Sequence, residues 1–202
     1  MTDLMFRGLA RWSAYAIAGL SLLYAVVYLG LVRPDPANTS ASALANGCIA
    51  LSGILATFAV IAVGDQVGGA AGRWLRVVGV GWALLSAAHG TFSMVADTQH
   101  LAAGDLSPTD PRGFATFGLA GLWSLVLGLA IRSGASFPRA LGAIALANGV
   151  DLLVLFVATA TGAGTLVLLT GGLASVILGP LLWVGIGRAI GGQQSAAQRQ
   201  RT

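Results

Sequence analysis

The sequence predicts an all-α membrane protein, a bundle of six transmembrane helices with both termini in the cytoplasm. Hydrophobic residues make up 56% of the 202-residue chain and charged residues only 9%, whereas soluble domains carry about 25% charged residues. The apolar residues fall into six runs, each close to the roughly 20 helical residues that cross a bilayer. The expected spans are 13–32, 43–63, 75–95, 113–131, 139–160 and 165–186.

The first span, 13–32, follows a short basic segment that contains Arg7 and Arg11. Its residues would cover about 30 Å at 1.5 Å per residue, the thickness of the hydrocarbon core. A cleavable signal peptide is the competing interpretation, because the small residues 41–43 resemble a cleavage site. The apolar core of a signal peptide is only about 7–15 residues long, and here Arg33 separates the run from those small residues. We therefore expect a retained first helix.

Proline and glycine mark the ends of the next spans. Pro34 and Pro36 end the first helix, since proline cannot continue it. The glycine-rich stretch 64–73 predicts a loop before the third span, and it lacks the spacing and the lysine of a phosphate-binding loop. A longer loop at 96–112 precedes the fourth span, which Pro111 opens in the first helical turn.

Two further prolines shape the last two spans. Pro138 opens the fifth span in its first turn. In the sixth span, Gly179 and Pro180 predict a kink, because proline removes a backbone hydrogen bond, and such breaks line binding cavities in some membrane proteins. The transmembrane domain is expected to cover 1–191, whereas 192–202 is interpreted as a polar cytoplasmic tail that is disordered at its end.

Arginine provides all eleven basic residues, and its distribution predicts the orientation. With a cytoplasmic N-terminus, nine arginines lie in inside segments and two outside, in agreement with the positive-inside rule. We therefore expect a multi-pass protein of a bacterial inner membrane; the lack of Lys and Glu is typical of a GC-rich genome. The inside arginines are Arg7, Arg11, Arg73, Arg76, Arg132, Arg139, Arg188, Arg199 and Arg201, and the outside ones are Arg33 and Arg112.

The fifth span carries Asn148 and Asp151 near its middle. A carboxylate there costs at least about 2.5–3.5 kcal/mol, so we expect it to face protein or water and to have a partner. His89 in the third span is the candidate, because it lies about 21 Å from the inner end of its span against about 18 Å for Asp151. Tyr24 falls at a similar depth in the first span. We therefore predict an interior ligand site that involves His89, Asn148, Asp151 and Tyr24.

Three interpretations of this interior stay open. In the first, which we favour, the protein binds or passes a small lipophilic or amphipathic molecule. In the second, it is an intramembrane acid–base enzyme of the isomerase or cyclase type, with His89 and Asp151 as the candidate catalytic residues. In the third, the chain is a structural or accessory subunit in which Asn148 and Asp151 only hold helices together, at about 0.6–2 kcal/mol per bond.

No metal, cofactor or nucleic-acid site is predicted. Asp97 and His100 could join His89 as metal ligands, but no motif spacing supports such a site, and we interpret Asp97 and His100 as parts of a solvated loop. The arginines flank apolar spans, where they orient the chain, and the single cysteine, Cys48, excludes an internal disulfide. The expected partners are membrane lipids and a small lipophilic ligand; assembly into a homo-oligomer or a larger membrane complex stays open.

Several short motifs resemble an uncharacterised family of small bacterial six-helix membrane proteins. The motifs occupy 42–57, 88–90, 108–113 and 178–187, and the similarity covers about residues 7–191. The family is a domain of unknown function, so the resemblance implies the six-helix architecture and no chemistry. In one departure, an acidic or amide residue is expected soon after His89, whereas this chain has no such residue before Asp97. This departure weakens the case for a histidine–acid pair within that helix.

Overall fold

The computed structural model describes residues 2–101 and 111–199, and every regular element within them is helical. Six helical spans are long and apolar enough to cross a membrane, which confirms an all-α, multi-pass fold. The elements are α1 (Asp3–Val27), η1 (Tyr28–Val32), α2 (Thr39–Val67), α3 (Gly69–Thr98), α4 (Pro111–Arg132), α5 (Arg139–Ala160), α6 (Gly164–Leu173), η2 (Ala174–Leu178) and α7 (Gly179–Arg199).

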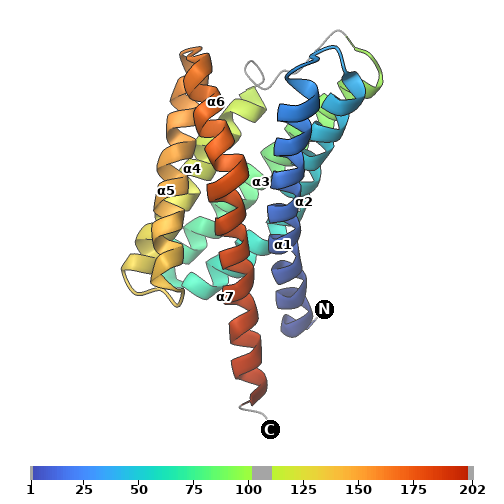
Figure 1. Cartoon of the computed structure of the whole chain (residues 1–202). Coiled ribbons are helices and arrows are strands. Elements are labelled where there is room, and N and C mark those ends of the chain that lie inside the picture. The colour runs from blue at the N-terminus through green and yellow to red at the C-terminus, as the bar shows by residue number, and fades with distance from the viewer. Residues whose placement is uncertain (1, 102–110, 200–202) are drawn as a thin grey trace.

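The helices stand side by side and alternate in direction (Figure 1). One end of the bundle holds the start of α1, the α2–α3 junction at Gly68 and the α4–α5 turn at 133–138; we call it the terminal end. The opposite end holds the α1–α2 turn at 33–38 and the α5–α6 turn at 161–163; we call it the cavity end.

The predicted loop at 64–73 is wrong. Helix α2 continues to Val67 and α3 begins at Gly69, so that Gly68, with φ +70°, is the single residue between them. The other glycines of this stretch allow close packing, because a Cβ on Gly72 would collide with the carbonyl oxygen of Gly64. A glycine-rich stretch indicates a loop in soluble proteins, whereas glycines in membrane helices let neighbouring backbones approach closely.

The ends of the chain are more helical than the sequence predicted. Helix α1 begins at Asp3, where the side chain of Thr2 caps it by accepting a hydrogen bond from the Met5 N–H. Helix α7 extends through Arg199, so the expected tail is helical over most of its length. Its Gln, Ala and Arg residues favour helix without an apolar stripe. Pro111 opens α4 as predicted, and residues 102–110 and 200–202 lie outside the described ranges.

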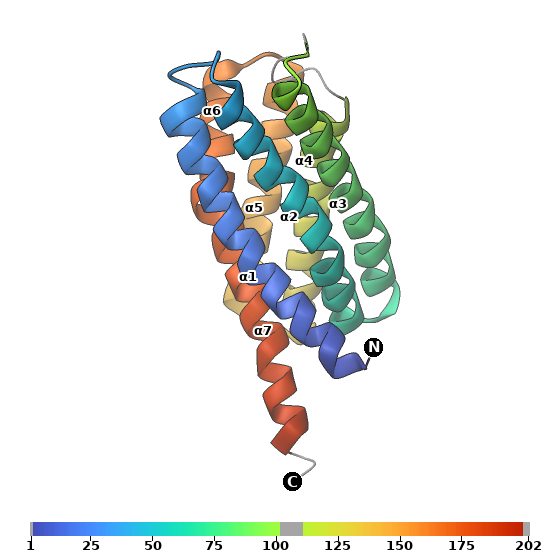
Figure 2. The same cartoon turned by 90° about the vertical axis from the view of Figure 1, so that its right-hand side faces the viewer.

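The bundle is built from tightly packed pairs. Helix α2 packs most extensively against α3, and α4 packs against α5. Helix α1 contacts α2 and α7, whereas α6 packs mainly against α5 (Figures 1 and 2). Helices α1, α2 and α3 thus form one group and α4, α5 and α6 form the other. Near the cavity end, a cavity lies between these two groups.

Three tryptophans join the groups in the centre of the bundle. Trp123 of α4 stacks on Trp183 of α7 with ring centroids 6.0 Å apart, and Trp82 of α3 lies 6.2 Å from each. The indole N–H of Trp123 donates to the Leu75 carbonyl at 2.9 Å. These rings close the core between the terminal end and the cavity.

Candidate functional site

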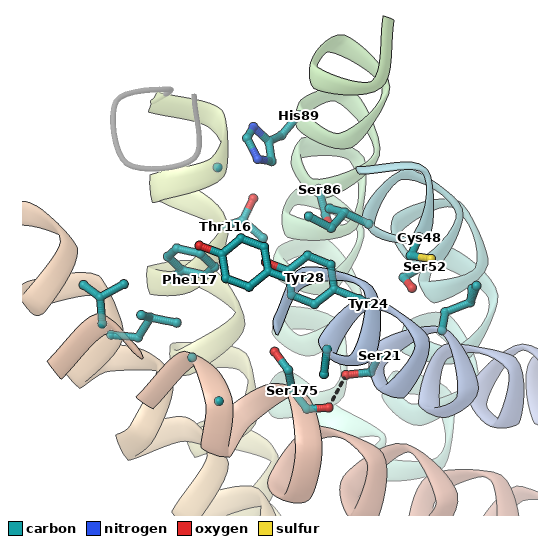
Figure 3. Close-up of a pocket in the computed structure, with 18 of the residues that line it drawn as sticks. Ser21, Tyr24, Tyr28, Cys48, Ser52, Ser86, His89, Thr116, Phe117 and Ser175 are labelled. Atoms are coloured by element: carbon teal, nitrogen blue, oxygen red, sulfur yellow. Dashed lines mark hydrogen bonds between the residues drawn. The ribbon is translucent and has the colours of Figure 1, made fainter. Parts of the chain in front are cut away.

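A cavity of about 520 Å³ lies between the two groups of helices, on the cavity-end side of the tryptophans. Helices α1 to α6 and both π-helical segments contribute to its wall, and Trp183 of α7 adds to it (Figure 3). Its apolar surface comes from residues such as Ile17, Leu20, Leu155, Val167 and Trp183. Its polar surface is made mostly of hydroxyl groups: Ser21, Tyr24, Tyr28, Ser52, Ser86, Thr116, Thr159 and Ser175.

Helix α1 and the π-helical segment η1 that continues it present one polar face to the cavity. Ser21, Tyr24 and Tyr28 follow one another at intervals of three and four residues, which places them on the same side of a helix. The two tyrosine rings stack with centroids 5.7 Å apart and an angle of 14° between planes. Figure 3 shows both rings projecting into the cavity. The stack gives the wall a flat, aromatic section between Trp183 and Arg33.

Helices α2, α3 and α4 add small polar groups to the wall. Cys48 and Ser52 lie one turn apart on α2, and Ser86 and His89 lie one turn apart on α3. Thr116 of α4 lies across the tyrosine rings from Cys48 and Ser52 (Figure 3). Such a surface can donate and accept single hydrogen bonds at several points without requiring a charged ligand there.

The π-helical segment η2 leaves one carbonyl group of the wall without an intrahelical donor. The Gly179 N–H bonds to the Ala174 carbonyl instead of that of Ser175, and Pro180 has no N–H to offer. The Ser175 carbonyl is therefore free to accept a hydrogen bond from the Ser21 hydroxyl of α1, at 2.9 Å (Figure 3). The predicted irregularity at Gly179 and Pro180 thus joins α1 to η2 at the cavity.

Glycines leave room on the α6 side. A Cβ on Gly164 or Gly172 would meet no heavy atom within 4 Å, and one on Gly171 would meet only Leu155 at 3.9 Å. All three residues line the cavity. Larger side chains at these positions would project into open space, so the glycines keep this part of the wall wide.

The structure places two of the predicted ligand residues at the cavity. Tyr24 and His89 both line it, and the His89 side chain is buried. Gly113 near the start of α4 packs against the imidazole, because a Cβ there would lie 2.8 Å from its Cε1 atom. His89 is therefore held close to the cavity end of the bundle.

Asn148 and Asp151 are not among the described residues that line the cavity. Both are buried, and the Asn148 amide donates to the Ser124 hydroxyl of α4 at 3.0 Å. The Oδ2 atom of Asp151 is buried without a hydrogen-bond partner in the described part of the chain. The partner predicted for this carboxylate is therefore not found there.

His89 and Asp151 lie at different depths. His89 is level with Gly113, whereas Asp151 lies between Gly149 and Leu153, which both pack against Gly121. Gly113 and Gly121 are eight residues apart on α4, which corresponds to about 12 Å along the helix axis. The sequence-based depth of His89 is counted from residue 75, the start of the apolar run, whereas α3 begins at Gly69. The depth of His89 is therefore underestimated. The structure does not bring this pair together.

Asp97 differs most from its prediction. It belongs to α3, is buried, and accepts a hydrogen bond from the Asn46 amide of α2 at 2.9 Å. The same amide nitrogen lies 3.4 Å from the Ser42 hydroxyl. The interpretation of Asp97 as part of a solvated loop is therefore wrong. Among the described residues, no cluster of three or more His, Cys, Asp or Glu side chains could hold a metal ion.

Sequence reasoning assigned no role to several cavity residues, above all Tyr28, Ser86 and Thr116. A signal for the α1 side exists, since hydroxyls recur on one face of an otherwise apolar span. Ser52 and Ser175 fall near the middle of their spans by residue count, but hydroxyls at that depth usually stabilise helix contacts. Only the packing of the helices shows that they surround one space.

No family model, curated protein or solved structure matches this chain. Its function has to be argued from the cavity.

Proposed function

We propose that this protein binds a small lipophilic or amphipathic molecule in the cavity and holds or passes it within the membrane. The observation that supports the proposal is the cavity itself, whose volume of about 520 Å³ falls in the 300–1,000 Å³ range that is typical of small-molecule sites. Its wall combines a largely apolar surface with separate hydroxyl groups. This combination suits an apolar molecule that carries a few polar atoms.

An acid–base enzyme is the weaker alternative. Proton transfer requires an acid and a base within hydrogen-bond reach of one substrate. His89 lines the cavity, but Asp151 lies about 12 Å deeper by the helical rise and outside the described lining. The two residues therefore offer no common site for catalysis, and binding requires only the cavity.

The orientation belongs to the same proposal. The arginines of the terminal end include Arg7, Arg73, Arg132 and Arg139, whereas Arg33 lies at the cavity end. By the positive-inside rule, the terminal end faces the cytoplasm of a bacterial inner membrane. The cavity then occupies the outer half of the bilayer. It would receive molecules from the outer leaflet or from outside the cell.

The tryptophans provide a test of binding. Trp82 and Trp183 line the cavity, whereas Trp12 and Trp74 are 66% and 37% exposed. In a protein with Trp12 and Trp74 changed to Phe, a terminally brominated hexadecanol is expected to quench the remaining fluorescence saturably. Titration of the purified protein in a neutral detergent measures this binding.

Two glycine variants make the binding test specific. Gly172→Leu places a side chain in the open space of the wall, so we expect saturable quenching to weaken at least about tenfold. Gly19→Leu is the matched control, because Gly19 also has no neighbour within 4 Å but does not line the cavity. Quenching that is linear in the alcohol concentration, or equal in both variants, would rule out binding in this cavity.

A further inference from the structure

We infer that the ligand is an amphiphile with one extended apolar chain and an anionic head group, and that Arg33 binds the head group. This inference rests on the proposed function and adds a chemical class to it. Arg33 follows η1 directly, and its backbone N–H donates to the Tyr28 carbonyl at 2.8 Å. It is the one Arg or Lys among the described lining residues, none of which is Asp or Glu.

The Arg33 guanidinium has no carboxylate partner in the described part of the chain. Arg76, by contrast, pairs with Asp65 at 2.8 Å. The acidic residue nearest to Arg33 in the sequence is Asp35, and its Oδ1 atom accepts a hydrogen bond from the Ala37 N–H at 3.2 Å. An arginine that lines a cavity in this way presents up to five N–H donors, arranged to fit a carboxylate or a phosphate.

The cavity is long in the direction of the helices. Ser21, which bonds to Ser175, and Arg33 both line it, and they lie twelve residues apart, about 18 Å along the helix. Apolar side chains, including Ile17 and Trp183, lie beyond Ser21 on the side away from Arg33. A ligand with its head group at Arg33 would therefore place an extended chain past the tyrosine stack and end it near the tryptophans.

The positive charge of Arg33 distinguishes cationic, neutral and anionic ligands. A cationic amphiphile would place its charge beside Arg33 and be repelled. A neutral alcohol would bind through its chain and through single hydrogen bonds to the hydroxyl groups. Only an anion adds a charge-assisted, bidentate interaction with the guanidinium, which is stronger than a neutral hydrogen bond.

The test compares terminally brominated hexadecanoate with the brominated hexadecanol, in the protein with Trp12 and Trp74 changed to Phe and at a pH where the acid is ionised. We expect the acid to bind at least about tenfold more tightly than the alcohol. Arg33→Gln should remove this preference, so that the ratio of acid to alcohol affinity falls to about one. Arg33→Lys should restore part of it, and Arg132→Gln, at the terminal end, should have no effect.

Each outcome decides one claim. Equal binding of acid and alcohol, or a preference for the acid that survives Arg33→Gln, would overturn the anionic class and leave the cavity function standing. Absence of saturable quenching by either probe would overturn the proposed function as well. A third arm uses phosphatidylglycerol with brominated chains: if it binds more tightly than hexadecanoate, the class would be a two-chain bilayer phospholipid, and the single-chain inference would be wrong.

Discussion

Asp151 is a buried carboxyl residue in the middle of helix α5. Its Oδ2 atom is buried without a hydrogen-bond donor among the described residues, while Asn148, one turn away, bonds to Ser124. A buried polar group without a partner costs about 1–3 kcal/mol, more if it is charged. Of the two, Asn148 is therefore the residue that joins helices α4 and α5.

The two residues should respond oppositely to removal of their polar groups. We expect Asp151→Leu, which has a similar volume, to raise the free energy of unfolding by about 1–3 kcal/mol, because it removes an unpaired group. Asn148→Leu should lower it by about 1 kcal/mol, because it leaves the Ser124 hydroxyl without its donor. Unfolding by titration with a denaturing detergent measures both. A loss of stability in Asp151→Leu would show that the carboxylate has a partner.

At the scale of elements, η2 and α1 depend on each other. The π-helical turn and Pro180 leave the Ser175 carbonyl without an intrahelical donor, and Ser21 supplies the missing hydrogen bond. Irregular backbone inside a membrane is tolerated only where its polar groups find partners. The contact between α1 and η2 is thus a consequence of Gly179 and Pro180.

A double-mutant cycle tests this dependence. Ser21→Ala is expected to cost about 1 kcal/mol of unfolding free energy. In a Pro180→Ala background the cost should be smaller, because residue 180 then has an N–H that can take up a free carbonyl of η2. Thr57→Val, which removes a hydroxyl bonded within its own helix, is the control and should give the same cost in both backgrounds. Equal costs of Ser21→Ala in both would refute the coupling.

The pairing of α2 and α3 depends on glycine at particular positions. A Cβ on Gly90 would collide with the Ala50 amide nitrogen of α2 and lie 2.7 Å from the Asn46 carbonyl oxygen. We expect Gly90→Ala to lower the free energy of unfolding by about 1–3 kcal/mol. Gly81→Ala, on the same helix with no neighbour within 4 Å, should be neutral or stabilising. The same detergent titration compares them, and similar effects would mean that Gly90 does not set the helix spacing.

At the scale of the whole molecule, the orientation can be measured by cysteine labelling in intact cells. After Cys48→Ala, a cysteine is introduced by Ala37→Cys in the α1–α2 turn or by Ser133→Cys in the α4–α5 turn. The positive-inside rule predicts that a membrane-impermeant maleimide labels the first variant in intact cells and the second only after permeabilisation. The reverse pattern would place the cavity in the cytoplasmic half of the bilayer.

Only part of the predicted ligand site coincides with the cavity. Tyr24 and His89, two of the four residues predicted to bind a ligand, line the cavity, because each lies far enough along its helix. The predicted depth match of His89 and Asp151 is not found, because it counts from the apolar run 75–95, whereas α3 extends from Gly69 to Thr98. Helix length beyond the apolar run is decided by local propensity and caps, which hydropathy does not measure.

The number of spans follows from the sequence alone, because the length and apolarity of each run are local properties that the bilayer selects. The distribution of arginines between the two ends of the bundle, on which the positive-inside rule depends, also follows from the sequence alone. The cavity is not, because its wall joins residues that are distant in the chain, as Ser21 and Ser175 show. Which hydroxyls face one space, and that Asp151 lies outside it, depends on how α1, α3 and α6 pack, and only the tertiary structure decides that.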